Sequence, residues 1–197
     1  MDSFGEILIY QTEDGLTKLD VRMENEKRMK MLLEAFPKTA PTYEFLQMFN
    51  FNDLPMPNFN QVRATFILDR ILGSHELCAY AWGEFRQCFL TDMELQAYYR
   101  AIYAMFIKLE DAIDAGKRVD LPVESNTRDV RSCAFRVGRE TIVMAVNISK
   151  ETSATVSFHT STKKVTDFMD DAWTFPLYNG AFKATLQPNE TLLLRLK

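Results

Sequence analysis

The hydrophobic pattern of this chain changes near Gly116. Apolar residues recur every three or four positions in the two longest periodic segments before that point, and they alternate with polar residues after it. A period of 3.6 is typical of helices, and a period of 2 is typical of strands. The sequence therefore predicts a mixed helical and extended first part and an all-strand last part, which together make an α+β fold.

Two segments before Gly116 have the features of helices. Asn58 followed by Gln61 matches a capping box and precedes apolar positions that run to Gly73. Thr91 with Glu94 matches a second capping box. The helix that follows carries a wide apolar stripe made of Leu95, Tyr98, Tyr99, Ile102, Met105, Phe106, Leu109 and Ile113.

Three shorter segments of the first part are expected to be mostly extended. The stretches 6–11 and 16–23 alternate around an Asp-Gly pair, which predicts a β-hairpin. The run 76–82 has the composition of a buried strand. The apolar run 29–36 is too short for its period to decide, so both a buried strand and a short helix stay open.

The last part reads as a series of short strands separated by turn signals. Thr141 to Ile148 is apolar on both faces, which is typical of a central strand, and Asn179-Gly180 predicts a hairpin turn. Alternation at this spacing predicts an antiparallel β-sandwich at 119–197, after a β-hairpin segment at 1–28 and a β/α region at 29–118. The apolar phases of the strands predict that Phe135, Val146, Val156 and Leu194 are buried.

Charge and composition narrow the function classes. A net charge of −4 opposes non-specific binding to nucleic acid, which needs clustered Lys and Arg. No segment approaches the ~20 apolar residues that span a bilayer, and the first ten residues lack the features of a signal peptide, so a cytoplasmic protein is expected. Three cysteines without paired spacing predict reduced thiols, and two distant histidines give no reason to expect a metal site or a cofactor.

Two resemblances cover different parts of the chain. The text EILIYQTEDGLTKLDVRMENE at 6–26 resembles the N-terminal hairpin of the virulence-associated RhuM family, but the chain departs from that family at about Lys27. From Met29 onward the chain resembles the C-terminal portion of a (β/α)8-barrel glycoside hydrolase. The resemblance rests on the order of LLEAF at 32–36, NFNQVRAT at 58–65, LGSHELCAYAW at 72–82, AFRVGRETIVMAVNIS at 134–149 and PNETLLLRL at 188–196.

The glycosidase resemblance implies a place for each candidate residue. It would make 29–36 similar to barrel strand seven, with Glu34 near the strand end where a retaining nucleophile is often found, and 76–82 similar to strand eight. Trp82 and Glu84 would follow that strand, where an aromatic ring and a carboxylate could contact a sugar. Glycoside hydrolysis needs a second carboxyl group as general acid. Nothing before Met29 resembles the first six barrel strands, so that partner is expected to be missing.

Three hypotheses for function follow. The first is a non-catalytic glycosidase-tail-like protein that serves as a carbohydrate-associated accessory module. The second is a glycoside hydrolase in which Glu34, with Glu84 or Glu76, acts inside an assembled or larger barrel. The third is a protein-interaction module led by the RhuM-like hairpin. The partners that these hypotheses allow are a carbohydrate and a second copy of the chain. Trp173, Phe175 and Tyr178 could line a carbohydrate face or plug a loop.

Overall fold

The computed structural model describes residues 4–7, 26–27, 30, 34, 42–47, 58–73, 76–80, 93–149 and 151–197. The chain divides into two compact units, Met1–Arg100 and Ala101–Lys197. Each unit is described by itself. The boundaries at residues 28 and 118 that the sequence suggests stay predictions. The fold class is confirmed, since helices and a parallel sheet precede an antiparallel β-sandwich.

The first unit contains a three-stranded parallel sheet in the order β1-β2-β3. Its strands are β1 (Phe4–Ile7), β2 (Thr42–Gln47) and β3 (Glu76–Tyr80). Helix α2 (Phe59–Leu72) lies between β2 and β3 in the chain. This alternation of parallel strands and helices is the arrangement of β/α units, and β3 confirms at 76–80 the strand that the sequence predicts at 76–82.

Two expectations for the first unit change. Lys30 and Glu34 are helical, and Lys30 Nζ pairs with Glu26 Oε1 at 2.6 Å, four residues away, as on one side of a helix. At these residues the helical alternative for 29–36 is correct, and the comparison with barrel strand seven is wrong. The predicted hairpin is not supported either, because β1 pairs in parallel with β2, and 16–23 lies outside the described residues.

The capping box of α2 is confirmed. Asn58 Oδ1 accepts the Gln61 N–H at 3.0 Å, and Gln61 Oε1 accepts the Asn58 N–H at 3.0 Å. Two otherwise unpaired donors of the first turn are thereby satisfied. Gly73 ends the helix with a φ of 104°, a left-handed conformation that glycine adopts at little cost.

Helix α3 (Met93–Asp114) carries the long stripe predicted from the sequence. Ile102, Met105 and Leu109 are buried, and Phe106 and Ile113 are half-buried. Thr91 and the side chains of Leu95 and Tyr98 lie outside the described residues. The helix closes with a hydrogen bond from the Gly116 N–H to the Ile113 carbonyl at 2.9 Å.

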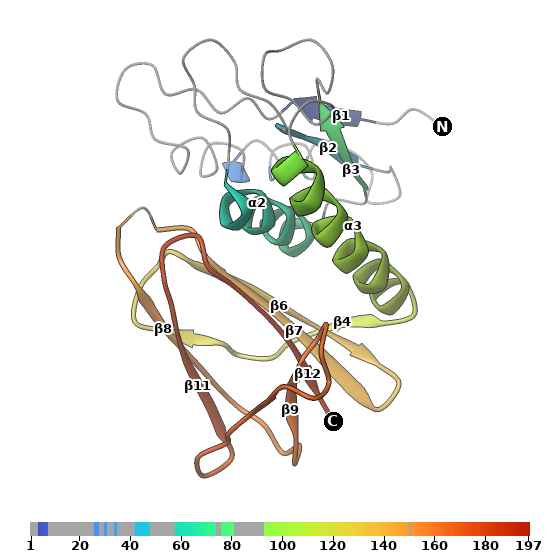
Figure 1. Ribbon diagram of the computed structural model, residues 1–197. Coiled ribbons are helices and arrows are strands. Elements are labelled where there is room, and N and C mark those ends of the chain that lie inside the picture. Colours follow the sequence, from blue (N-terminus) through green and yellow to red (C-terminus); the bar gives the residue numbers. More distant parts are fainter. Residues whose placement is uncertain are drawn as a thin grey trace. The chain divides into compact units, whose positions relative to one another are not determined.

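Two antiparallel sheets form the sandwich of the second unit (Figure 1). The larger sheet has six strands in the order β10-β9-β12-β7-β6-β4, and the smaller has three in the order β11-β8-β5. The strands are β4 (Lys117–Val119), β5 (Glu124–Ser125), β6 (Val130–Val137), β7 (Glu140–Asn147), β8 (Ala154–His159), β9 (Val165–Asp167), β10 (Thr174–Phe175), β11 (Ala181–Leu186) and β12 (Thr191–Leu196).

The core lies between the two sheets. Phe158 of β8 and Phe182 of β11 stack with ring centroids 4.9 Å apart, and both are almost completely buried. They face a row of apolar side chains from the larger sheet. The cluster comprises Ala134, Val143, Ala145, Val156, Phe158, Val165, Phe182, Leu186, Leu192, Leu194 and Leu196.

The larger sheet is also buried on its outer face, away from the smaller sheet. Strand register pairs Ala134 with Val143 on the inner face and therefore places Phe135 beside Ile142 on the outer face. Val146 is fully buried on this outer face. The predicted burial of Val146, Val156 and Leu194 is confirmed, whereas Phe135 is only half-buried. Alternation alone finds the two faces of β6 but does not tell which one meets the other sheet.

The predicted Asn179-Gly180 turn is present. Tyr178 and Ala181 exchange two backbone hydrogen bonds of 2.9 Å, and the two residues between them have φ values of 52° and 75°. Positive φ at both central positions defines the tight hairpin turn that Asn-Gly favours. The turn fixes the start of β11 opposite the end of β8, where Ala181 pairs with His159.

Candidate functional site: a polar cluster and loop on the sandwich

Of the three residues singled out in the first unit, Glu34 is the one that lies within the described residues. Glu34 is helical and exposed. Trp82 and Glu84 follow β3 in the chain but lie outside the described residues, so their contact with a sugar stays a prediction. Catalytic residues of β/α barrels sit at the C-terminal ends of strands, and Glu34 does not have such a position.

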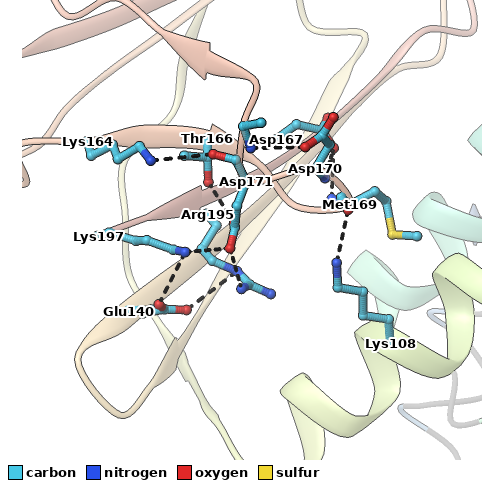
Figure 2. A network of polar contacts seen from close by, with 11 residues as sticks. Lys108, Glu140, Lys164, Thr166, Asp167, Met169, Asp170, Asp171, Arg195 and Lys197 are labelled. Atoms are coloured by element: carbon cyan, nitrogen blue, oxygen red, sulfur yellow. Dashed lines mark hydrogen bonds and ion pairs between the residues drawn. The ribbon is translucent and has the colours of Figure 1, made fainter.

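A polar cluster forms at one end of the larger sheet of the sandwich (Figure 2). Alternation puts Thr166 of β9, Arg195 of β12 and Ile142 of β7 on the same outer face, because Arg195 pairs with both of the others. Glu140 and Lys197 occupy the same phase of their strands, two residues from Ile142 and Arg195. The register of three strands therefore gathers two cations and one carboxylate on one face.

Asp171, from the loop between β9 and β10, completes this cluster. Its Oδ2 lies 2.7 Å from Lys197 Nζ and 3.7 Å from Arg195 Nη1. Its Oδ1 accepts the Thr166 hydroxyl at 3.3 Å. Glu140 pairs with the same two cations, at 3.4 Å from Arg195 Nε and 3.8 Å from Lys197 Nζ. Two carboxylates and two cations thus balance each other, and they tie the loop to β12 and β7.

The electrostatic surroundings favour the ionised form of Asp171. The hydrogen bond from Lys197 lowers the pKa of the Asp171 carboxyl, and the positive charge of Arg195 lowers that pKa further. A general acid for glycoside hydrolysis needs the opposite shift, toward a raised pKa. Asp171 is therefore suited to hold a loop in place and unsuited to donate a proton.

The loop itself is braced by short-range hydrogen bonds. Asp167 Oδ1 accepts the N–H groups of Met169 at 2.7 Å and Asp170 at 3.2 Å. Asp170 Oδ1 accepts the Ala172 N–H at 2.9 Å. Trp173 closes the loop through both backbone groups, donating to the Asp170 carbonyl at 3.0 Å and accepting the Asp167 N–H at 2.9 Å. Aspartate side chains, such as those of Asp167 and Asp170, often accept hydrogen bonds from backbone N–H groups in turns.

Phe168 anchors the loop through its buried ring. Its ring is completely buried, with the Arg195 guanidinium 4.9 Å and the Lys108 ammonium 5.3 Å from the ring centroid. Lys108, from the part of α3 that belongs to the second unit, also donates to the Met169 carbonyl at 3.1 Å (Figure 2). Burying a Phe side chain is worth about 1.5–3 kcal/mol, whereas exposed ion pairs contribute little. Phe168 therefore supplies most of the anchoring, and the Asp171 contacts set the orientation of the loop.

The three aromatic residues at positions 173, 175 and 178 differ in exposure. Trp173 is 67% exposed and Tyr178 is 70% exposed. Phe175 is half-buried and meets Phe182 edge to face at 5.9 Å. Phe175 thus belongs to the core, as the loop-plug alternative predicts, whereas Trp173 and Tyr178 present their rings to solvent.

The second unit also has an open surface hollow of about 590 Å³ beside β4 and β6. One wall contains Cys133, whose side chain is buried. The lining offers a single carboxylate, from Asp120, so it lacks the pair that glycoside hydrolysis requires. The lining residues are Arg118, Val119, Asp120, Leu121, Pro122, Val123, Ser132, Cys133 and Ala134.

Two other features, a metal-ligand cluster and a membrane-spanning helix, are absent from the described residues. No group of three or more His, Cys, Asp or Glu residues is placed to hold a metal ion in that part of the chain. No helix within the described residues is long and apolar enough to cross a membrane.

The chain has a parallel β/α layer followed by an antiparallel sandwich. Solved glycoside hydrolases have a similar fold. AmyP in complex with maltotriose matches with a TM-score of 0.59 at 12% identity, over 85% of this chain and 43% of that chain. The alpha-amylase from Geobacillus thermoleovorans complexed with acarbose matches with a TM-score of 0.58 at 13% identity, over 89% and 42%. A GH30 endoxylanase from Clostridium papyrosolvens matches with a TM-score of 0.53 at 14% identity, over 100% and 49%.

These matches establish the fold alone. The chain spans less than half the length of each of these enzymes. No family model matches the sequence, and comparison with curated proteins found no similar sequence. The glycosidase resemblance drawn from the sequence is therefore supported at the level of fold, and the RhuM resemblance is not supported.

The polar cluster and the loop that it holds are not predicted from the sequence. Glu140, Asp171, Arg195 and Lys197 are spread over 58 positions, so no local motif announces them. One signal was available, because the run Asp167 to Asp171 contains three aspartates next to a Trp. Such a run predicts a turn with side-chain caps, but its ion partners become visible only with the strand register.

We predict that Asp171→Asn lowers the thermal midpoint of the chain at neutral pH. The folded chain holds the pKa of Asp171 below its ordinary value of about 3.9, so the stabilisation is complete above that pH and is lost as the pH falls through the lower, folded-state pKa. The difference between wild type and variant should therefore shrink as the pH drops below about 4, and it should also shrink at high salt.

The measurement is differential scanning calorimetry across this pH range, with Asp120→Asn as a control. Asp120 is exposed and lies just after β4, outside the cluster. The thermal midpoint of Asp120→Asn should differ little from that of the wild type, and this difference should be nearly constant with pH. An Asp171→Asn difference that is equally flat would contradict the proposed role of the carboxylate.

Proposed function

We propose that this chain is a non-catalytic, carbohydrate-associated accessory module with the fold of the last part of a glycoside hydrolase. The observation that carries the proposal is the fold match, which extends over 85% of the chain or more in the three enzymes named above. Two of those enzymes were solved with maltotriose or acarbose bound. Fold does not fix function, so the proposal must be supported from the residues of this chain.

The position of Glu34 supports a non-catalytic role. A nucleophile must lie beside the scissile bond, about 5 Å from the second carboxyl group in a retaining enzyme. Glu34 is exposed on a helical segment, whereas barrel catalysis uses side chains at strand ends. Asp171, the carboxylate best fixed in the sandwich, has a lowered pKa and two cationic partners. Glu34 therefore lacks the position that a nucleophile needs, and Asp171 lacks the raised pKa that a general acid needs.

We expect binding of a saccharide to raise the thermal midpoint of the chain. A ligand that binds only the folded state stabilises it by an amount that grows with ligand concentration, roughly 2.7 kcal/mol at one hundred times Kd. The screen should include maltotriose, xylotriose and cellotriose at millimolar concentrations. Midpoints that stay constant for every saccharide would contradict the accessory-module proposal.

We expect no hydrolysis of aryl glycosides by the wild-type chain. Loss of general-acid catalysis alone costs typically 10² to 10⁴ in rate, and loss of substrate positioning costs more. The assay compares wild type with Glu34→Gln on a panel that includes substrates with good leaving groups, which need little acid assistance.

Equal background rates in wild type and variant are the expected result. Turnover that is well above buffer and disappears in Glu34→Gln would make Glu34 a nucleophile and overturn the non-catalytic proposal. Turnover that survives the substitution would also overturn it, provided that activity follows the protein peak through purification, and would direct attention to another carboxylate such as Glu84.

A further inference from the structure

Trp173 is a large apolar side chain that the fold leaves in solvent. Trp173 is 67% exposed, and its ring makes no ring contact and its Nε1–H donates no hydrogen bond within the described part of the chain. Its backbone, in contrast, is fully engaged, since both its N–H and its carbonyl hydrogen-bond inside the loop. The indole therefore extends from a fixed base and contributes little to the core.

The loop that carries Trp173 is braced by contacts with the rest of the sandwich. Phe168 is buried beneath it, Asp171 is paired with Lys197 and Arg195, and Asp167 caps two backbone N–H groups. An aromatic group on a rigid support loses little conformational entropy when it binds a ligand. A Trp ring offers a flat apolar face together with an N–H donor at its edge.

We infer that Trp173 and the loop Asp167–Trp173 form a saccharide-binding subsite, with the indole face as the stacking platform. The inference rests on the proposed function and adds to it a position and a ligand class. A pyranose ring has an apolar face of C–H groups that fits the indole, and a rim of hydroxyl groups that donate and accept hydrogen bonds. The same loop carries Asp170, a carboxylate that can accept hydrogen bonds from such a rim.

The charges on and beside the loop indicate a neutral saccharide. Asp170 and Trp173 are joined at the two ends of one turn, and Asp170 uses only its Oδ1 within the described residues. On the other side of the loop, Lys164 Nζ donates to the Asp171 carbonyl at 3.4 Å. Carboxylate acceptors and ammonium donors are thus both present. A ligand of either charge would meet a like charge, whereas hydroxyl groups can pair with both kinds.

Tyr178 supplies a matched control. It is an exposed aromatic residue with 70% of its surface accessible, and it lies next to a different turn, bridged to Ala181. Its turn, Asn179-Gly180, contains no charged residue, whereas the loop that carries Trp173 contains three aspartates. Removal of the Tyr178 ring tests whether any exposed aromatic side chain on the sandwich would serve.

The experiment is a titration of the ¹⁵N-labelled full-length chain with maltotriose, followed by NMR. We expect the Trp173 indole N–H and the amides of the loop to shift with one saturable binding curve. Trp173→Ala should weaken binding about tenfold or more, because truncation of a central Trp is among the costliest interface changes. Trp173→Phe should recover part of the affinity, and Tyr178→Ala should leave it unchanged.

Three results would overturn the inference in distinguishable ways. Saturable shifts that fall elsewhere in the chain, with Trp173→Ala binding as tightly as wild type, would place the saccharide site away from this loop and leave the proposed function standing. Equal losses in Trp173→Ala and Tyr178→Ala would show non-specific aromatic contact. Absence of shifts with maltotriose, xylotriose and cellotriose would reject the subsite and the proposed function together.

Discussion

The pairing of β7 with β12 is the constraint on which the described sandwich depends. β7 is buried on both faces, and each of its residues from Thr141 to Val146 has a partner on β12. One register therefore fixes two surfaces at once. It points Leu192, Leu194 and Leu196 toward the core between the sheets, and it points Arg195 toward the outer face. A slip of one residue would exchange the two sets and move the Arg195 guanidinium into the apolar core between the sheets.

The polar cluster follows from this register. Arg195 reaches Asp171, Glu140 and the Phe168 ring because it stands between β7 and β9 on the outer face. The same contacts orient the β9–β10 loop and leave Trp173 in solvent. A buried hydrophobic core thus determines, through strand register, where an exposed aromatic side chain is held. This path from core to surface is the physical basis of the proposed saccharide subsite.

Local signals in the sequence predict much of this fold. The Asn58 capping box, the Gly73 terminus and the Asn179-Gly180 turn are each set by a few adjacent residues, and each is present as expected. Apolar residues on both faces of 141–148 predict a central strand, and β7 occupies such a position in the larger sheet.

The features that the sequence does not predict share a cause. Each depends on contacts between residues that are far apart in the chain. The segment at Lys30 and Glu34 is helical although its letters suit a strand as well, and periodicity over eight residues cannot separate the two. Phe135 occupies the apolar phase of β6, yet Ala134 is the residue that faces the core cluster. The Asp171 cluster is assembled from four strand and loop segments, so nothing short of the strand register could predict it. Among the site residues, Glu34 lies on a helical segment, whereas the glycosidase resemblance predicts a strand end.

Hydrogen exchange of the full chain, with and without saturating maltotriose, tests the central claim most directly. That claim is that a rigid sandwich, rather than a catalytic barrel end, receives the saccharide. The amides of β7 and β12 should exchange most slowly in both states, and the saccharide should add protection at Asp167–Trp173. Added protection around Glu34 or directly after β3, with none in the sandwich loop, would contradict the account.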